Sequence, residues 1–509
     1  MFLDSNSFFY NLWPGLLIVC FLFLVLSFYI KRKWQVLERL NIPHDPPSLL
    51  NIGHFRTFYS KSENFFIQDL ERKKRFGLIY GFYVGLQPRI VIHDPNILRQ
   101  IYVKQFSNFR DRQRTFNRIN GRVMNLSLTA VCGEHWKRIR HTISPFFSTS
   151  SLKKTIQFIE TSSDRLAANL NNTIKLGRFE AKELFGRYSI EVISLAAFGV
   201  DIQCQDGPNS YENKQVKMVK KMFNVSLLKS RMFRLFMLFP NIQYIAEKFN
   251  YSLYASGTID YFSRLADKIK TTTKDKQQVN DVMQMMLSNE IKDTTTMQHT
   301  RKGMTNEEIT ANSVMMITGG YETTANALTF LAYNLATHKD AQARVYREVQ
   351  TAITKYGGFT YNAFGKMKYL TMCINESLRL YSTVGRNIRF CENDTIINGV
   401  KIPKGVHVEI PVYGLSHDEE YWTDPYHFNP QRMEDMNKID PMVFQPFGGG
   451  PRNCIGMRFA MMEIKMAICK ILKEFELDVC DDTPPPPLEM TYRASMQPKE
   501  TIYLRVFRR

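Results

Sequence analysis

The sequence predicts a mainly α-helical fold with small β-sheets, in which one large domain follows a single N-terminal membrane helix. An uncharged apolar span covers residues 12–30, a proline-free stretch runs from Thr305 to about His338, and residues 80–93 alternate in character. An apolar span of this length is typical of a membrane helix. The proline-free stretch would form a helix roughly 50 Å long, and the alternating segment is typical of a β-hairpin.

Residues 1–33 are predicted to form the membrane anchor. Lys31, Arg32 and Lys33 follow the apolar span at once, and positive charge on that side predicts that the rest of the chain stays in the cytosol. The alternative is a cleaved secretory signal, which has a positively charged front end and a small-residue cleavage site. The sequence has neither feature, so we expect a single-pass anchor.

The remaining chain divides into a short hinge and one large domain. Residues 34–54 contain Pro43, Pro46 and Pro47, which predict a stiff, non-helical connection from residue 41 onward. Residues 55–509 are expected to form one large domain, although a length of 509 residues would also suit two to four domains.

The charge balance is basic, because 67 Lys and Arg residues against 48 Asp and Glu residues give a net charge of +19. Such an excess suits nucleic acid, anionic lipid or an acidic protein partner. The sequence has no nucleic-acid motif with interleaved aromatic residues, so we expect membrane lipid and an acidic partner, and no nucleic acid.

Residues 213–239 are typical of an amphipathic helix on an anionic membrane, and equally of a plain surface helix. The 8 cysteines form no CxxC pair, which favours a reducing compartment.

One cysteine stands in a glycine-rich loop directly before a predicted helix at residues 457–475. The loop has the pattern Phe-x-x-Gly-x-Arg-x-Cys-x-Gly, beginning at Phe447 and ending at Gly456, with Arg452 and Cys454 inside it. A sulfur at a helix N-terminus faces unpaired N–H groups, which favour the thiolate. A buried structural thiol is the alternative, but five fixed positions at this spacing favour a metal ligand.

This pattern resembles the haem-ligand loop of the cytochrome P450 superfamily, the haem-thiolate monooxygenases, and is closest to their animal drug- and steroid-oxidising group. The resemblance implies a cytochrome P450 fold that binds haem b, iron protoporphyrin IX, with Cys454 as the metal ligand. It also implies cofactor-binding roles for Phe447, Arg452 and Gly456.

The resemblance implies further contacts with the haem propionates. Trp136 and Arg140 stand four residues apart, which places them on one face of a helix. A solvated basic face is the alternative for this pair. Arg389 matches a propionate-binding arginine on a strand beside the pocket, and Arg112 is a further candidate in an arginine-rich segment.

The long helix contains an unusual pair of glycines. Thr305 and Glu308 form a capping box at its start, and Gly319 and Gly320 stand in its middle at a cost of up to about 1 kcal/mol each. Either a packing contact or a kink that makes room for a small ligand would explain them. The resemblance assigns Gly320 to the cofactor site.

The residues after the glycine pair match the family's catalytic pair. By resemblance, Glu322 and Thr323 are the catalytic acid and alcohol that deliver protons to dioxygen, and the Thr323 hydroxyl can bond back to a carbonyl one turn earlier. A third feature resembles the family's structural triad: Glu376 and Arg379 lie three residues apart, and Arg432 follows downstream.

The resemblance implies a monooxygenase that inserts one oxygen atom of O2 into an apolar small molecule, a sterol, fatty acid or xenobiotic. The sequence has no flavin or dinucleotide fingerprint, so electrons are expected from a separate NADPH-dependent cytochrome reductase, with cytochrome b5 as a second candidate partner. Lys137, Arg138 and Lys465 are expected to give that partner a basic surface.

By the same resemblance, the protein is expected in the endoplasmic reticulum membrane. Two alternatives keep the cysteine loop: a haem-thiolate peroxide isomerase, which needs no reductase, and a haem protein that binds a ligand without turning it over. Neither needs Glu322 and Thr323, so the intact pair favours oxygen activation.

Overall fold

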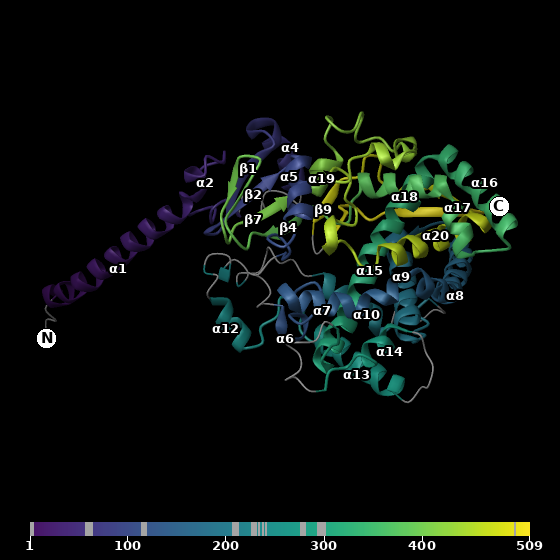
Figure 1. Ribbon diagram of the computed structural model, residues 1–509, viewed down its shortest axis with the longest axis horizontal. Coiled ribbons are helices and arrows are strands. Elements are labelled where there is room, and N and C mark those ends of the chain that lie inside the picture. The colour runs from purple at the N-terminus through teal and green to yellow at the C-terminus, as the bar shows by residue number, and fades with distance from the viewer. Residues whose placement is uncertain are drawn as a thin grey trace.

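The computed structural model describes residues 5–509 except 56–64, 113–119, 206–212, 225–231, 233–234, 237–238, 240–241, 275–280, 293–301 and 493–494. Helices predominate and the sheets are small, as the sequence predicts. Figure 1 shows one helix projecting from a body in which helices surround a long central helix.

The N-terminal helix α1 (Ser5–Trp34) projects away from the body, and its end meets α2 (Val36–Arg39) next to the main sheet (Figure 1). The span Gly15–Arg39 has a mean hydropathy of 2.0, so it is long and apolar enough to cross a membrane. Its large apolar side chains are exposed, as a membrane-facing helix requires. Helical backbone reaches Arg39, so only the later part of residues 34–54 is the predicted non-helical hinge.

The main sheet has four strands in the order β1-β2-β7-β4. The antiparallel pair β1 (Ile79–Val84) and β2 (Gln87–Ile92) confirms the predicted hairpin. Strand β7 (His407–Ile410) pairs parallel with β2, and β4 (Asn387–Phe390) pairs antiparallel with β7 at the edge of the sheet.

Three smaller sheets complete the strand arrangement, with the orders β3-β11-β8, β10-β9 and β5-β6. Their strands are β3 (Phe179–Glu180), β5 (Thr395–Ile397), β6 (Val400–Ile402), β8 (Phe475–Val479), β9 (Met490–Tyr492), β10 (Met496–Pro498) and β11 (Tyr503–Arg508).

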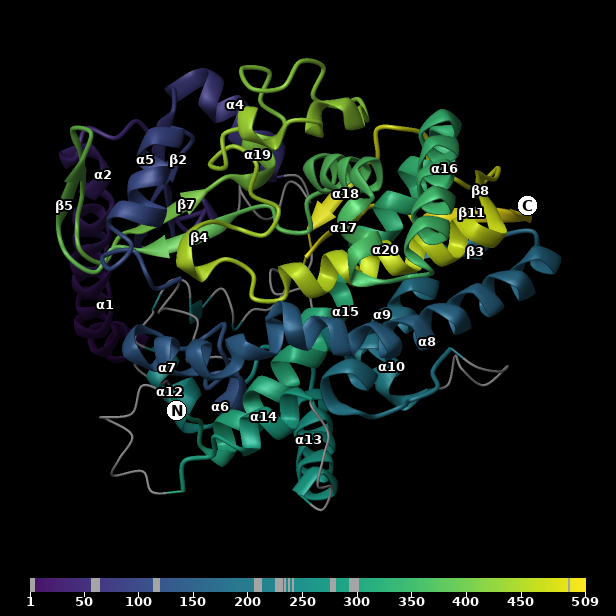
Figure 2. The same ribbon diagram turned by 45° about the vertical axis from the view of Figure 1, so that its right-hand side comes forward.

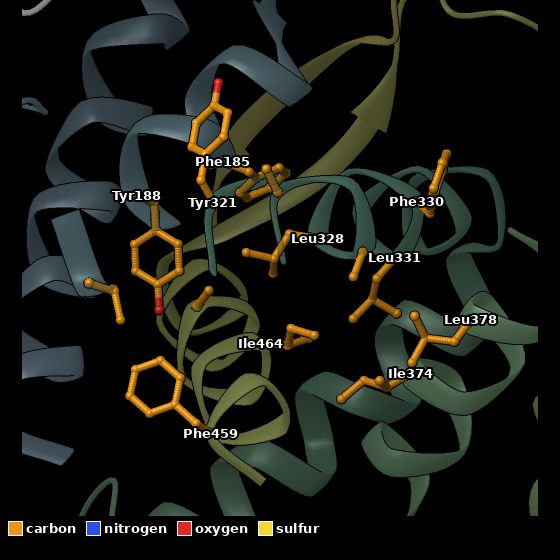
Figure 3. Packing of buried hydrophobic residues seen from close by; sticks show 14 of the residues in the cluster. Phe185, Tyr188, Tyr321, Leu328, Phe330, Leu331, Ile374, Leu378, Phe459 and Ile464 are labelled. Atoms are coloured by element: carbon orange, nitrogen blue, oxygen red, sulfur yellow. The ribbon is translucent and has the colours of Figure 1, made fainter. Parts of the chain in front are cut away.

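The central helix α15 (Asn306–Thr337) confirms the predicted long helix, including its capping box between Thr305 and Glu308. It packs against α9 (Ala181–Phe198), α18 (Lys368–Leu380) and α20 (Met457–Glu474). Figure 3 shows the core that results, with side chains such as Leu328, Ile374 and Ile464 between these helices. The core fixes α15 relative to α20, the helix that follows the cysteine loop (Figure 2).

The other helices surround this core. They are α4 (Phe65–Phe76), α5 (Pro95–Arg99), α6 (Gly121–Met124), α7 (Gly133–Ile143), α8 (Thr149–Thr173), α10 (Lys214–Phe223), α12 (Gln243–Lys248), α13 (Thr258–Lys274), α14 (Val282–Leu287), α16 (Lys339–Tyr356), α17 (Tyr361–Lys366) and α19 (Val412–Ser416). Short π or 3-10 turns are η1 (Gln100–Lys104), η2 (Ser144–Phe147), η3 (Ile174–Leu176), η8 (Pro430–Met433), η9 (Met436–Lys438) and η10 (Gly450–Arg452). Within the predicted amphipathic segment 213–239, α10 is helical, and residues 225–231, 233–234 and 237–238 lie outside the described part.

Candidate active site

The cysteine loop is a tight turn between η10 and the start of α20. The Cys454 amide donates to the Phe447 carbonyl oxygen at 2.8 Å, which closes the loop. Gly450 has a φ of 68°, and a Cβ there would collide with the Tyr102 carbonyl oxygen. Only glycine satisfies both conditions. At Gly456, in contrast, a Cβ would meet the Cys454 Sγ at 4.0 Å in ordinary contact, so the backbone does not require glycine there.

Cys454 differs from the buried cysteines because its side chain is accessible, although the helix behind it is buried. This accessibility favours a ligand-binding cysteine over the structural thiol. Burial by the surrounding protein raises the pKa of the thiol, and it outweighs the lowering by the Gly456 amide and by Arg112 and Arg140. The Gly456 and Met457 amides at the helix N-terminus lower the pKa of the thiol, as the sequence predicts, but burial has the larger effect.

Three arginines converge on the backbone of this loop from three separate segments. Arg140 on α7 donates to Asn453 through Nη1 to the carbonyl oxygen at 2.9 Å and Nη2 to Oδ1 at 3.1 Å. Arg112 donates to the Arg452 carbonyl oxygen at 3.1 Å. Arg389 on β4 reaches the Gly449 carbonyl oxygen at 3.4 Å and the Ile388 carbonyl oxygen at 3.0 Å. The structure thus brings together residues that are up to 340 positions apart along the chain.

Arg452 itself is directed into the protein. Its Nη2 donates to the Val131 carbonyl oxygen at 2.7 Å, and its Nη1 lies 3.3 Å from the Asp111 carboxylate. The guanidinium also lies 5.0 Å from the centre of the Trp136 ring. Trp136 is buried on α7, so the alternative of a solvated basic face is wrong for this residue.

The arginine cluster, which we define as Arg112, Arg140, Arg389 and Arg452, carries more positive charge than its surroundings balance. Burial and the neighbouring arginines lower the pKa of Arg112 to about 9. Among the described residues, the buried Nε atoms of Arg112, Arg389 and Arg452 have no hydrogen-bond partner. Buried cations with unused donors are costly unless an anion pairs with them. The two carboxylates of a haem b molecule fit this requirement.

On the central helix, a strip of accessible positions crosses an otherwise buried surface. Met315 is half-buried, and Gly319 and Thr323 are exposed, at spacings of one helical turn. The Thr323 hydroxyl donates to the Gly319 carbonyl oxygen at 2.8 Å, which confirms the predicted bond to the preceding turn. The strip therefore presents an alcohol side chain and a glycine to the same accessible space.

The two glycines have different surroundings. A Cβ at Gly320 would meet Cγ1 of Ile193 on α9 at 3.1 Å, so a close helix contact explains this glycine. A Cβ at Gly319 would meet one atom within 4 Å, the Met315 Sδ at 4.0 Å. Packing thus accounts for Gly320, whereas Gly319 leaves open space one turn before Thr323. The backbone is helical without a break from Asn306 to Thr337.

Glu322 does not share the accessible strip with Thr323, because its side chain is buried on another face of α15. Lys182 on α9 donates to its Oε1 at 2.7 Å, and the Ser495 hydroxyl does so at 3.2 Å. Lys182 was not predictable from the sequence. No local pattern marks it, because it lies 140 residues before its partner. Its side chain is partly accessible, so it connects the buried carboxylate with the protein surface.

The expected basic surface beside the cysteine loop is largely wrong. Arg138 is buried and forms a two-pronged ion pair with Glu308, with contacts at 2.6 and 2.9 Å. Lys465 is buried and donates to the Phe364 carbonyl oxygen at 2.7 Å. Lys137 is exposed, and Glu134 partly neutralises it at 3.0 Å. Two of the three expected cations are therefore structural.

The Glu376, Arg379 and Arg432 triad assembles as the sequence predicts. The Glu376 carboxylate accepts from Arg379 Nε and Nη2 at 2.9 Å each and lies 3.3 Å from Arg432 Nε. Glu376 and Arg379 are completely buried. A buried ion group of this kind is stable only when its remaining donors are also satisfied, and Arg379 donates further to the Ser416 and Pro425 carbonyl oxygens.

Known proteins resemble this chain over nearly its whole length. The family model described as Cytochrome P450 matches residues 43–506. The chain is 34% identical to Cytochrome P450 3A11 of Mus musculus over 94% of this chain and 93% of the relative. It is also 34% identical to Cytochrome P450 3A5 of Homo sapiens, over 97% of this chain and 98% of the relative.

Proposed function

The chain belongs to the cytochrome P450 family and is a haem monooxygenase, and from this premise we propose that it oxygenates an apolar sterol, fatty acid or xenobiotic with electrons from a separate NADPH-dependent reductase. When bound, haem b supplies the redox-active iron that activates dioxygen and inserts one of its atoms into substrate. The observation that carries this proposal is the accessible Cys454 on a loop whose backbone accepts hydrogen bonds from Arg112, Arg140 and Arg389.

Cys454 would ligate the iron, and the arginine cluster would hold the two propionates. Arg112, Arg140 and Arg389 already point donors at the loop backbone, and guanidinium groups pair well with carboxylates. Arg452 would contribute its charge from inside the protein without binding a propionate directly, because it already donates to Asp111 and to the Val131 carbonyl oxygen. Trp136, Phe447, Gly320 and Gly456 stay predicted cofactor neighbours.

Proton delivery is the second task of the chain. Thr323 presents its hydroxyl oxygen on the accessible strip, and Glu322 is held on the adjoining buried face by Lys182. We assign to Thr323 the hydrogen bond that orients dioxygen and to Glu322 the supply of protons. Partly accessible Lys182 links Glu322 with solvent, so a proton can reach the carboxylate without opening the substrate space.

The partners and the location follow from the same proposal. The α1 helix would anchor the protein in the endoplasmic reticulum membrane, with the body in the cytosol, because Lys31, Arg32 and Lys33 end the span. The reductase, and cytochrome b5 as a second electron donor, would meet the protein from that side. The net charge of +19 suits acidic partners and anionic lipid.

The test is product formation from a panel of sterols, fatty acids and xenobiotics by the full chain in lipid vesicles, with and without reductase and NADPH. The proposal requires product only when both are present. Turnover of a lipid hydroperoxide without reductase would instead support the peroxide isomerase. Ligand binding without any turnover would support the non-catalytic haem protein.

A further inference from the structure

A buried network of charges joins α4, β1, β2 and β7 to the residue before β4, the strand whose Arg389 reaches the cysteine loop. Arg386, the residue before β4, donates to the Asp69 carboxylate on α4, through Nε to Oδ2 at 2.8 Å and through Nη2 to Oδ1. It also donates to Glu409 Oε2 on β7 at 2.7 Å. The other oxygen of Glu409 accepts from Arg89 on β2 at 2.7 Å. The Tyr80 hydroxyl on β1 donates to Asp69 at 2.6 Å.

These groups are out of contact with water. The side chains of Arg386, Asp69 and Glu409 are 5%, 1% and 2% exposed. Burial lowers the pKa of Arg386, but the charges of Asp69 and Glu409 outweigh it and raise the pKa above its ordinary value. Buried ion groups add little stability over apolar packing. The network therefore calls for an explanation other than stability.

The position of the network relative to β4 supplies that explanation. Strand β4 spans only four residues and stands at the edge of its sheet, paired through β7 alone. Beyond the strand pairing, the Phe390 amide donates to the Asp111 carbonyl oxygen at 2.8 Å and holds the far end. Arg386 holds the near end. Arg389 lies between these two attachments, and a shift of one residue would turn its side chain to the opposite face.

We infer that Asp69 and Glu409 form a clamp on Arg386 that fixes the register of β4, so that Arg389 faces the cysteine loop and the cofactor carboxylate. The inference rests on the proposed function, since it assigns to Arg389 a propionate contact. Arg386, Asp69 and Glu409 are thus positioning residues. Arg89 contacts the same carboxylate from the side away from β4 and is not part of the clamp.

The test is the rate at which the haem-loaded full chain transfers its haem to excess apomyoglobin, together with the urea midpoint of unfolding. Asp69→Asn and Glu409→Gln are expected to speed haem loss by about tenfold, because each removes a charge-assisted bond from the clamp. Arg89→Leu is the matched control. It breaks the other half of the Glu409 network, so it should lower the unfolding midpoint and leave haem loss unchanged.

Arg386→Lys is the milder variant in case the first two fail to fold. It keeps the charge but cannot form the forked contacts, so haem loss should again accelerate. If haem loss follows the unfolding midpoint across all variants, including Arg89→Leu, or does not change in any clamp variant, the clamp is refuted.

Arg389→Leu separates this result from the proposed function. Faster haem loss in Arg389→Leu with no change in the clamp variants would refute the clamp and keep the propionate contact. Unchanged haem loss in Arg389→Leu would remove the propionate role of Arg389, and the clamp with it.

Discussion

Exchanging each glycine of the central helix for alanine should have opposite effects on stability. Gly→Ala inside a helix gains about 1 kcal/mol. At Gly319 that gain is complete, because the nearest atom to a new Cβ is the Met315 Sδ at 4.0 Å. At Gly320 the new Cβ would meet three atoms of Ile193 between 3.1 and 3.4 Å, and overpacking costs about 1–3 kcal/mol.

Gly319→Ala should therefore raise the free energy of unfolding by about 1 kcal/mol, whereas Gly320→Ala should leave it unchanged or lower it by up to about 2 kcal/mol. Urea unfolding of the full chain, followed by far-UV circular dichroism, measures both values. Equal stabilisation by both variants would refute the close contact between Gly320 and α9. Destabilisation by Gly319→Ala would refute the open space.

The variants Gly319→Ala and Gly320→Ala should also differ in how strongly they bind ligands. Gly319→Ala adds a methyl group to the accessible strip one turn before Thr323, so bulky ligands should bind to it more weakly than to the parent protein. The haem spin-state shift measures this binding. A Cβ at Gly320 would meet Ile193, so Gly320→Ala should weaken the binding of these bulky ligands less than Gly319→Ala does.

Three further predictions concern other parts of the site. Thr323→Ala should keep haem and release peroxide in place of product, and unchanged coupling of NADPH use to product would remove its proton-delivery role. Hydrogen bonds from His135 and Arg138 outweigh burial and lower the pKa of Glu308 to about 2, so this carboxylate should stabilise the fold by about 2 kcal/mol above pH 4.5 and lose that contribution as the pH falls toward 2. Urea midpoints between pH 5 and pH 3 should show the loss in the parent and not in Glu308→Gln. Arg379→Met should cost about 3–5 kcal/mol because it leaves Glu376 charged and buried, and a loss below 1 kcal/mol would contradict the importance of the triad.

The parts of the site that were predictable from sequence are those with local patterns. The capping box at Thr305 is a spacing of three residues, and the long helix after it contains no proline. The cysteine loop is one short segment whose backbone demands glycine at Gly450. In both patterns a few neighbouring residues determine the local backbone geometry. The structure therefore agrees with the prediction at both places.

The remaining features depend on contacts between distant segments. Lys182 meets Glu322, and Arg386 meets Asp69, only after the chain has folded. Arg138 and Lys465 were expected at the surface because their side chains are basic. Each is buried instead, and each binds a distant partner that the local sequence does not show. The pKa of Cys454 likewise depends on how much protein surrounds it. Residue type alone does not give burial.

The most direct test of the account is the absorption spectrum of the purified, reduced protein with carbon monoxide. If Cys454 supplies the sulfur ligand, the full chain shows the long-wavelength band of thiolate-ligated haem, and Cys454→Ser loses it. Survival of that band in Cys454→Ser, or a parent spectrum typical of a nitrogen ligand, would contradict the account.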